Sequence, residues 1–392
     1  MKKIISILTA TRAEYGLLKP IIKKLMITEE YDIRIAVTGM HLSPEYGLTY
    51  QEIEKDGFSI DKKIDILLCS GNPTAVSKSM GLALISFSEY FEELKPNLLL
   101  VLGDRYETLA VCIAAMNARI PIAHLHGGEI TEGLIDEAIR HSITKMSYLH
   151  FTSTEEYKRR VIQLGENPGR VFNVGAVGIE AISQMKFMDL KEFEQSVDFE
   201  IKGKLALLTF HPVTLENDTA QKQFHHILQA LDEFDDLQII ITKANADAGG
   251  AAINRMIDEY ADKNRGKCRA FYSLGQERYL NAMNRCDFII GNSSSGIIEA
   301  PSFKKPTINI GDRQKGRVQA KSVINCGPIK SEIVSAIKKA MSKDFLATLS
   351  DMENPYGNGN VSAKVISVIN EYLKQEISLK KQFYDVSPED CL

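Results

Sequence analysis

The chain has 392 residues, a length that favours two domains because a single hydrophobic core of this size is uncommon. Its hydrophobic fraction of 44% is typical of a folded protein, and its net charge of -4 disfavours a protein that coats nucleic acid. The six cysteines show no C-x-x-C spacing and no apolar run approaches ~18 residues, so we expect reduced thiols, a cytoplasmic location and no membrane span.

Short apolar runs alternate with amphipathic segments through the first half of the chain. The expected strands are 4–9, 33–37, 98–102 and 122–126, and the expected helices are 17–26, 76–94, 108–117 and 137–146. The strands are continuous Ile, Leu and Val runs, a pattern typical of strands buried on both faces. Strands that alternate with helices in this way predict a parallel doubly wound sheet.

The same alternation starts again after a polar, charged stretch at about 188–204, which we interpret as a linker. The second set of expected strands is 205–210, 237–242, 268–271, 288–291 and 307–310, and the expected helices are 221–234, 253–263, 279–284, 296–302 and 332–341. We therefore predict two Rossmann-like α/β domains that face each other across a cleft, at 1–187 and 188–362. A last helix is expected at 363–373, and the helical C-terminal segment 363–392 is expected to pack back on the first domain.

Ligands of open parallel sheets bind beyond the carboxyl ends of the strands, so the loops that follow the strands are expected to carry the function. The first loop, A-T-R-A-E-Y-G at 10–16, lacks G-x-G-x-x-G, and this argues against nicotinamide and flavin cofactors. Arg12 stands just before a helix and could bind phosphate or be an ordinary surface arginine. Asp104, in L-G-D-R-Y-E at 102–107, could be a functional carboxylate or a helix N-cap.

The loop H-L-H-G-G-E at 124–129 concentrates polar groups in the first domain. His126, Glu129 and Asp136 cluster within this loop and the helix start that follows, and they are candidates for general acid and base. His124, His126 and Glu129 could instead chelate a metal, but residues along a strand alternate between its faces, and we predict no metal site. At least one of the two histidines is expected to be structural, and the two glycines to let the backbone approach a ligand.

The clearest motif of the second domain is I-I-G-N-S-S-S-G-I-I-E-A at 289–300. A buried strand ends at Gly291, and serines then precede a helix whose free N–H groups could bind a diphosphate. Glu299 could accept both hydroxyls of a ribose. Serine N-capping is the structural alternative, but the run of small and polar residues exceeds what a cap needs. Other strand-end loops supply His211 in F-H-P and Arg313 in I-N-I-G-D-R.

Jointly these motifs resemble the hydrolysing UDP-N-acetylglucosamine 2-epimerases of bacterial sialic-acid synthesis. The resemblance is carried, in family order, by T-R-A-E-Y-G, V-T-G-M-H, V-L-G-D-R-Y-E, H-G-G-E, I-R-H-S-I-T-K-M-S, G-N-S-S-S-G and I-N-I-G-D-R-Q-K-G-R. It implies a GT-B fold with the sugar nucleotide in the cleft. It also implies a reaction that releases UDP and N-acetylmannosamine, with no cofactor and no required metal.

The residues and the resemblance together give two groups of site residues. The expected catalytic group is Asp104, His126, Glu129, Asp136 and His211. The expected UDP-sugar-binding group is Arg12, Arg105, Asn245, Ser273, Ser293, Ser294, Glu299 and Arg313. Many relatives read I-E-G-G-E where this chain has L-H-G-G-E at 125–129, so either His126 or Glu129 would transfer the proton in place of the missing glutamate.

Several alternatives remain open on the sequence. A GT-B glycosyltransferase would use the same UDP site, a non-hydrolysing epimerase would return UDP-N-acetylmannosamine, and a sugar-nucleotide-binding regulator would need only the second domain. The substrate could also be UDP-2,4-diacetamido-2,4,6-trideoxyglucose, on the way to legionaminic acid. The resemblance implies a homodimer or homotetramer that binds a UDP-sugar, and we expect neither nucleic acid nor membrane as a partner.

Overall fold

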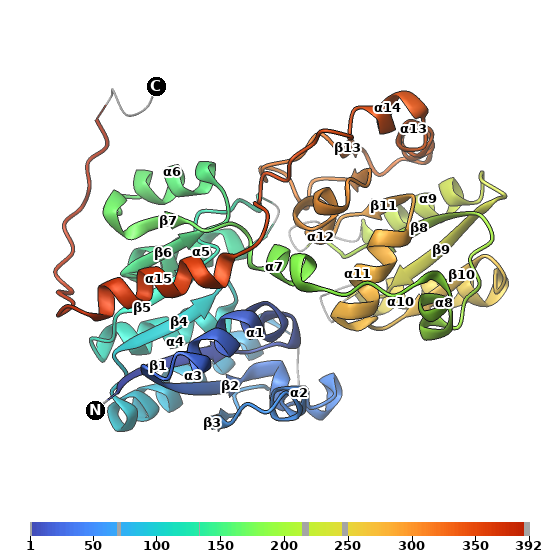
Figure 1. Cartoon of the computed structure of the whole chain (residues 1–392). Coiled ribbons are helices and arrows are strands. Elements are labelled where there is room, and N and C mark those ends of the chain that lie inside the picture. The colour runs from blue at the N-terminus through green and yellow to red at the C-terminus, as the bar shows by residue number, and fades with distance from the viewer. Residues whose placement is uncertain (1, 69–71, 133, 214–218, 245–249, 388–392) are drawn as a thin grey trace. The chain divides into compact units, whose positions relative to one another are not determined.

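The structure, a computed structural model, describes residues 2–68, 72–132, 134–213, 219–244 and 250–387. They form two compact units, each with its own β-sheet (Figure 1). Unit 1 consists of Met1–Glu129, Asp136–Ala181 and Gly359–Leu392, and unit 2 consists of Ile130–Ile135 and Ile182–Asn358. The short excursion of Ile130–Ile135 into unit 2 has no counterpart in the domains expected at 1–187 and 188–362.

Unit 1 is built on a seven-stranded parallel sheet with the order β3-β2-β1-β4-β5-β6-β7. Its strands are β1 (Lys3–Thr9), β2 (Tyr31–Thr38), β3 (Ile60–Ile64), β4 (Leu98–Leu102), β5 (Ile122–Leu125), β6 (Leu149–Thr152) and β7 (Val171–Asn173). Its helices are α1 (Arg12–Ile27), α2 (Tyr50–Lys55), α3 (Pro73–Leu94), α4 (Tyr106–Asn117), α5 (Asp136–Met146), α6 (Glu155–Gln163), α7 (Val177–Gln184, which ends in unit 2) and α15 (Val361–Leu373).

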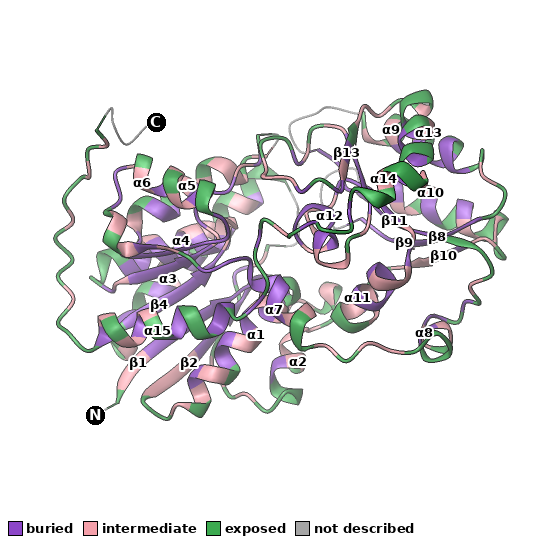
Figure 2. Cartoon of the chain, turned by 45° about the horizontal axis from the view of Figure 1, so that its top comes forward, coloured by how far each residue is buried: buried purple, intermediate pink, exposed green. Residues whose placement is uncertain are grey.

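Helices cover both faces of this sheet. One apolar cluster packs the sheet against α1 and α15, and a second packs the other face against α3 and α4. Central strands such as β4 are therefore buried, while the outer faces of the helices are exposed (Figure 2). Helix α1 begins where it does because Thr11 and Glu14 form a capping box, in which each side chain accepts the other residue's N–H.

Unit 2 repeats the design with a six-stranded parallel sheet in the order β10-β9-β8-β11-β12-β13. The strands are β8 (Lys204–Thr209), β9 (Leu237–Thr242), β10 (Cys268–Phe271), β11 (Phe288–Gly291), β12 (Thr307–Ile310) and β13 (Val323–Cys326). The helices are α8 (Leu190–Val197), α9 (Ala220–Leu231), α10 (Gly250–Lys263), α11 (Gly275–Arg285), α12 (Ser295–Ile298), α13 (Lys330–Ala340) and α14 (Lys343–Ala347). The predicted α/β class with two Rossmann-like, doubly wound sheets is confirmed.

Two expectations about the connections are wrong. The stretch expected to be a linker contains α8, whose Phe193 and Val197 are buried in the core of unit 2. The last helix, α15, agrees with the helix expected at 363–373, but helical structure does not continue through the segment 363–392. The buried apolar stripe of α15 ends at Leu373, and the described residues beyond it are not helical. In the described part of the chain, no helix combines the length and the apolar character that crossing a membrane requires.

Candidate active site

The strand order places a switch point in each sheet. In unit 1, β1 lies between β2 and β4, and in unit 2, β8 lies between β9 and β11. The loops after β1 and β4 therefore run to opposite faces of the first sheet, and the loops after β8 and β11 to opposite faces of the second. Crevices at such points are the usual ligand sites of open parallel sheets. The predicted site residues that the structure describes all follow the carboxyl ends of strands, and several of them follow the strands at these two switch points.

Arg140 on α5 is the centre of a charged cluster in unit 1. Its side chain is 1% exposed, and it donates to Asp104 through Nε at 2.9 Å and also through Nη2. Nη1 donates to Glu137 Oε2 and to the main-chain oxygen of Glu129, both at 2.7 Å. The side chains of Asp104 and Glu137 stay 28% and 29% exposed. A buried cation therefore presents two accessible carboxylates together, as proton transfer to and from one substrate would require.

Sequence reasoning missed part of this cluster. It selected Asp136, the first residue of α5, whereas the structure brings the next residue, Glu137, to Arg140. His141 also belongs here, with Nε2 3.1 Å from Glu137 Oε1. The sequence could have indicated these contacts, because Arg140 and His141 follow Glu137 by three and four positions. Residues with this spacing share one face of a helix.

His126 and Glu129 form a second, more buried pair. His126 Nδ1 lies 3.1 Å from Glu129 Oε1, and His126 Nε2 accepts the main-chain N–H of Val177 at 3.2 Å. The backbone of His126 is left-handed, with φ +66°, which costs a non-glycine residue about 1–2 kcal/mol. Among the residues that the structure describes, no three His, Cys, Asp or Glu side chains converge as a metal site would require.

His124 has the structural role expected for one of the two histidines. It is fully buried, burial lowers its pKa to about 3, and its Nε2 lies 2.8 Å from the main-chain oxygen of Gly103, next to Asp104. The glycines of this loop also have a structural reason, because the chain itself packs closely against them. A Cβ on Gly128 would lie 2.5 Å from the main-chain oxygen of Tyr157.

The two arginines predicted in unit 1 are both paired with carboxylates. Arg12 Nε lies 2.9 Å from Glu52 in an exposed ion pair, which contributes at most about 1 kcal/mol, so Arg12 can exchange this partner for a phosphate at little cost. Arg105 binds the fully buried Glu107 through Nε at 3.1 Å and Nη2 at 2.8 Å. Part of its donor capacity is thus used to neutralise a buried charge.

In unit 2, Asn292 fastens two loops together, a role that the sequence did not reveal. Strand β11 ends at Gly291, where a Cβ would lie 1.9 Å from the main-chain oxygen of Thr209 on β8, so only glycine fits. The next residue, Asn292, is 1% exposed; its side chain accepts the N–H of His211 and donates to the oxygen of His211, both at 2.7 Å. The loops after β8 and β11 are therefore locked to each other.

The serines follow directly on Asn292. Ser293 Oγ lies 3.0 Å from Ser295 Oγ, which lies 2.5 Å from the hydroxyl of Tyr279. Ser293, Ser294 and Glu299 are half-buried. The helix expected at 296–302 is shorter: α12 is followed by a 3-10 turn at Ala300–Phe303, which contains a proline at its second position. Arg313 Nη1 donates to the main-chain oxygen of Asn292 at 3.2 Å.

His211 and Arg313 divide their electrostatic roles. Burial, reinforced by the positive charge of Arg313, lowers the pKa of His211 to about 3, so the imidazole is neutral at neutral pH. A phosphate at this loop would take its countercharge from Arg313 and only a hydrogen bond from His211. Ser273 is exposed after β10 and accepts the N–H of Gly275 at 3.1 Å; Asn245 lies outside the described residues.

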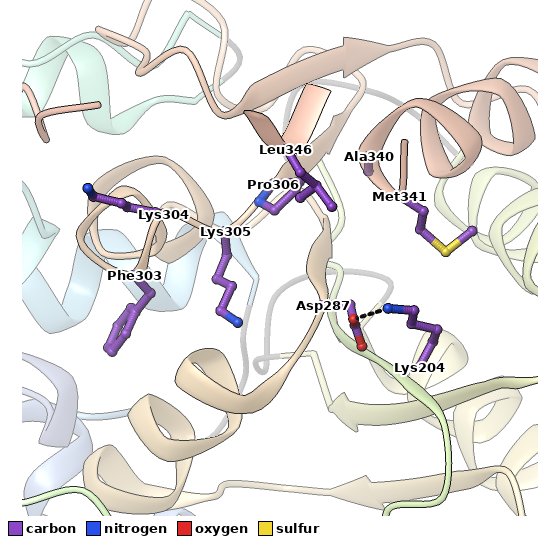
Figure 3. A pocket seen from close by; sticks show the side chains of 9 residues that line it. All are labelled: Lys204, Asp287, Phe303, Lys304, Lys305, Pro306, Ala340, Met341 and Leu346. Atoms are coloured by element: carbon purple, nitrogen blue, oxygen red, sulfur yellow. Dashed lines mark hydrogen bonds and ion pairs between the residues drawn. The ribbon is translucent and has the colours of Figure 1, made fainter. Parts of the chain in front are cut away.

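A hollow of about 250 Å³ also lies on unit 2 (Figure 3). Lys204, at the start of β8, forms an ion pair at 2.8 Å with Asp287, which precedes β11. Phe303, Lys304, Lys305, Pro306, Ala340, Met341 and Leu346 complete the lining. Because this is the amino-terminal edge of the sheet, the hollow is separate from the loops that carry the candidate site.

Comparison with known proteins connects these features to one family. A sequence model described as UDP-N-acetylglucosamine 2-epimerase matches residues 23–370, which is most of the chain. The chain belongs to this family. It is 44% identical over 385 residues to the GDP/UDP-N,N'-diacetylbacillosamine 2-epimerase (hydrolyzing) of Campylobacter jejuni, with 98% of this chain and 100% of the relative covered.

Two further relatives extend the comparison. The chain is 41% identical over 387 residues to the polysialic acid biosynthesis protein P7 of Escherichia coli, with 98% of each chain covered. A crystal structure of UDP-GlcNAc 2-epimerase from Neisseria meningitidis, bound to UDP-GlcNAc, is similar in fold with a TM-score of 0.80 at 19% identity. That match covers 94% of this chain and 100% of the other, in agreement with the predicted GT-B class.

Proposed function

We propose that the chain is a hydrolysing UDP-sugar 2-epimerase, an enzyme that releases UDP together with the free 2-epimer of the sugar. The observation that carries the proposal is the pair of accessible carboxylates, Asp104 and Glu137, held by the buried Arg140 at the carboxyl edge of the unit 1 sheet. Family membership supports a reaction at carbon 2, and the name of the Campylobacter jejuni relative supports hydrolysis.

Departure of UDP is the first chemical requirement. The hydrogen on carbon 2 of the sugar has no neighbouring carbonyl group to make it acidic. When the bond between carbon 1 and the diphosphate oxygen breaks, its electron pair leaves with UDP, and the cationic character left at carbon 1 acidifies carbon 2. Stabilising the leaving diphosphate is therefore expected to be the largest catalytic contribution. We assign it to Ser293, Ser294, Arg313 and His211 in unit 2, and to Arg12 in unit 1.

Proton transfer at carbon 2 completes the reaction. One carboxylate of the Asp104–Glu137 pair removes the proton, which gives a glycal with a double bond between carbons 1 and 2. A water oxygen then adds to carbon 1 while a proton returns to the opposite face of carbon 2. The net change is UDP-sugar plus water to UDP plus the epimerised sugar, so no redox cofactor is needed. Two proton-transfer groups are required, and this fits a paired rather than a single carboxylate.

Two sugars compete as the substrate. UDP-N-acetylglucosamine, which would give N-acetylmannosamine for sialic-acid-type synthesis, is supported by the relative named for polysialic acid biosynthesis. UDP-N,N'-diacetylbacillosamine, which is UDP-2,4-diacetamido-2,4,6-trideoxyglucose, is supported by the name of the Campylobacter jejuni relative. The two differ at carbons 4 and 6 of the ring, so the reacting positions are the same for both.

The test is to incubate the protein with each nucleotide sugar alone, without an acceptor, and to follow UDP and free sugar by NMR. We expect equal amounts of UDP and free 2-epimer, and a higher kcat/KM for the true substrate. A requirement for an acceptor would instead indicate a glycosyltransferase. Accumulation of the UDP-linked epimer would indicate a non-hydrolysing epimerase, and either result would overturn the proposal.

A further inference from the structure

The histidine that replaces the glutamate of many relatives is held in a way that excludes it from proton transfer. We propose that His126 is a positioning residue: it fixes the H-G-G-E loop, through which Arg140 presents Asp104 and Glu137, and it exchanges no proton with the substrate. This inference rests on the proposed function and narrows its chemistry, because it leaves the carboxylates on Arg140 to do the acid and base work.

The hydrogen bonds of the ring determine where its proton lies. The N–H of Val177, the first residue of α7, donates to His126 Nε2 at 3.2 Å, so Nε2 carries no proton. The proton of the neutral ring is therefore on Nδ1, which faces Glu129 Oε1 at 3.1 Å. Both nitrogens are occupied by groups of the chain, and neither a free lone pair nor a free proton is left for a substrate.

The side chain of Glu129 is likewise bonded to other groups of the chain. Its Oε1 also accepts the hydroxyl of Ser153 at 2.8 Å, and its side chain is 4% exposed, against 13% for His126. The side chains of Asp104 and Glu137 are 28% and 29% exposed. A substrate can therefore reach the carboxylates on Arg140, whereas the His126–Glu129 pair lies beneath the surface of unit 1.

The pair acts on the carboxylates through the main chain. His126 and Ser153 hold the side chain of Glu129, and the main-chain oxygen of Glu129 accepts Arg140 Nη1 at 2.7 Å. The same guanidinium binds Asp104 and Glu137. If the H-G-G-E loop shifted, the main-chain oxygen of Glu129 would move away from Arg140. The guanidinium would then move too, together with Asp104 and Glu137, which must reach carbon 2 of the sugar.

The decisive variants are His126→Gln and His126→Ala, with His225→Gln as the matched control on the exposed face of α9. A glutamine amide can accept from Val177 and donate to Glu129, but it cannot carry a proton between groups. We expect His126→Ala to lower kcat about 100-fold with little change in KM, because reacting groups are misplaced. His126→Gln should restore most of that loss and keep the wild-type pH profile of kcat, and His225→Gln should behave as wild type.

Two results would overturn the inference. One is a His126→Gln variant as inactive as His126→Ala, or one whose pH profile has lost a limb. The other comes from nitrogen NMR of protein labelled at its histidine nitrogens, with the His126 signal identified by its loss in His126→Gln. We expect a proton on Nδ1 and none on Nε2 at neutral pH, and the reverse tautomer would contradict the structure. The spectrum needs no turnover, so a failure of the proposed function is distinguished from a failure of this inference.

Discussion

Replacing Asn292 with alanine tests how unit 2 is organised around its nucleotide loop. The variant removes both side-chain hydrogen bonds to His211 and leaves the N–H and the oxygen of that residue without them. Asn292 and His211 are 1% and 8% exposed, so water has little access to these two groups. Each buried polar group left unsatisfied costs about 1–3 kcal/mol, which gives a total of about 2–6 kcal/mol for the two groups.

The matched control is Gln319→Ala in the loop before β13, where the half-buried glutamine is bonded through its side chain to the exposed side chain of Asn325. Urea unfolding followed by circular dichroism should show a loss of about 2–6 kcal/mol for Asn292→Ala and below about 1 kcal/mol for the control. Calorimetric titration with UDP should show affinity at least about tenfold weaker for Asn292→Ala, because the side chain of Asn292 holds the loop of His211 in place. Equal stability losses together with unchanged UDP affinity would refute the reasoning.

The remaining predictions concern the two halves of the site and the response to acid. Asp104→Asn and Glu137→Gln should each lower kcat by about 100-fold or more, while calorimetry shows UDP affinity within about threefold of wild type. Ser294→Trp should do the reverse, with UDP affinity falling by about tenfold or more because the indole fills the loop that receives the diphosphate. Burial lowers the pKa of His124 from its ordinary 6.5 to about 3. Below pH 6.5, His124 therefore binds a proton in the unfolded chain but not in the folded one. The free energy of unfolding should therefore fall by about 1.4 kcal/mol per pH unit between pH 6.5 and about 3 on account of His124. Subtracting urea titrations of His124→Asn from those of wild type isolates this contribution, and parallel curves would contradict it.

The fold was largely predictable because burial on both faces leaves a direct mark on the sequence. β4 reads L-L-L-V-L and β9 reads L-Q-I-I-I-T, and both are buried along their whole length. β3, with the sequence I-D-K-K-I, escaped prediction because it lies at the edge of its sheet and exposes its lysines. The segment around α8 resembled a linker because only Phe193 and Val197 of that helix are buried.

The candidate site could be predicted as a set of loops at strand ends, but the contacts between its residues could not. Asp104, His126, His211 and Ser293 are recognisable as polar residues after apolar runs. Which of them are accessible depends on contacts distant in the sequence, such as the N–H of Val177 on His126, 51 positions away. The burial of Arg140 could not be predicted either, because an arginine on an amphipathic helix has the same sequence signature whether it faces solvent or a carboxylate.

The origin of the hydrogen on carbon 2 of the product tests the central claim most directly. The protein is incubated with UDP-N-acetylglucosamine, and in parallel with UDP-N,N'-diacetylbacillosamine, in heavy water, and the released sugar is examined by proton NMR. The account predicts a free 2-epimer that carries deuterium at carbon 2, because the original proton leaves with a protein carboxylate and a solvent hydrogen returns. A released sugar that keeps its original hydrogen at carbon 2 would contradict elimination through a glycal.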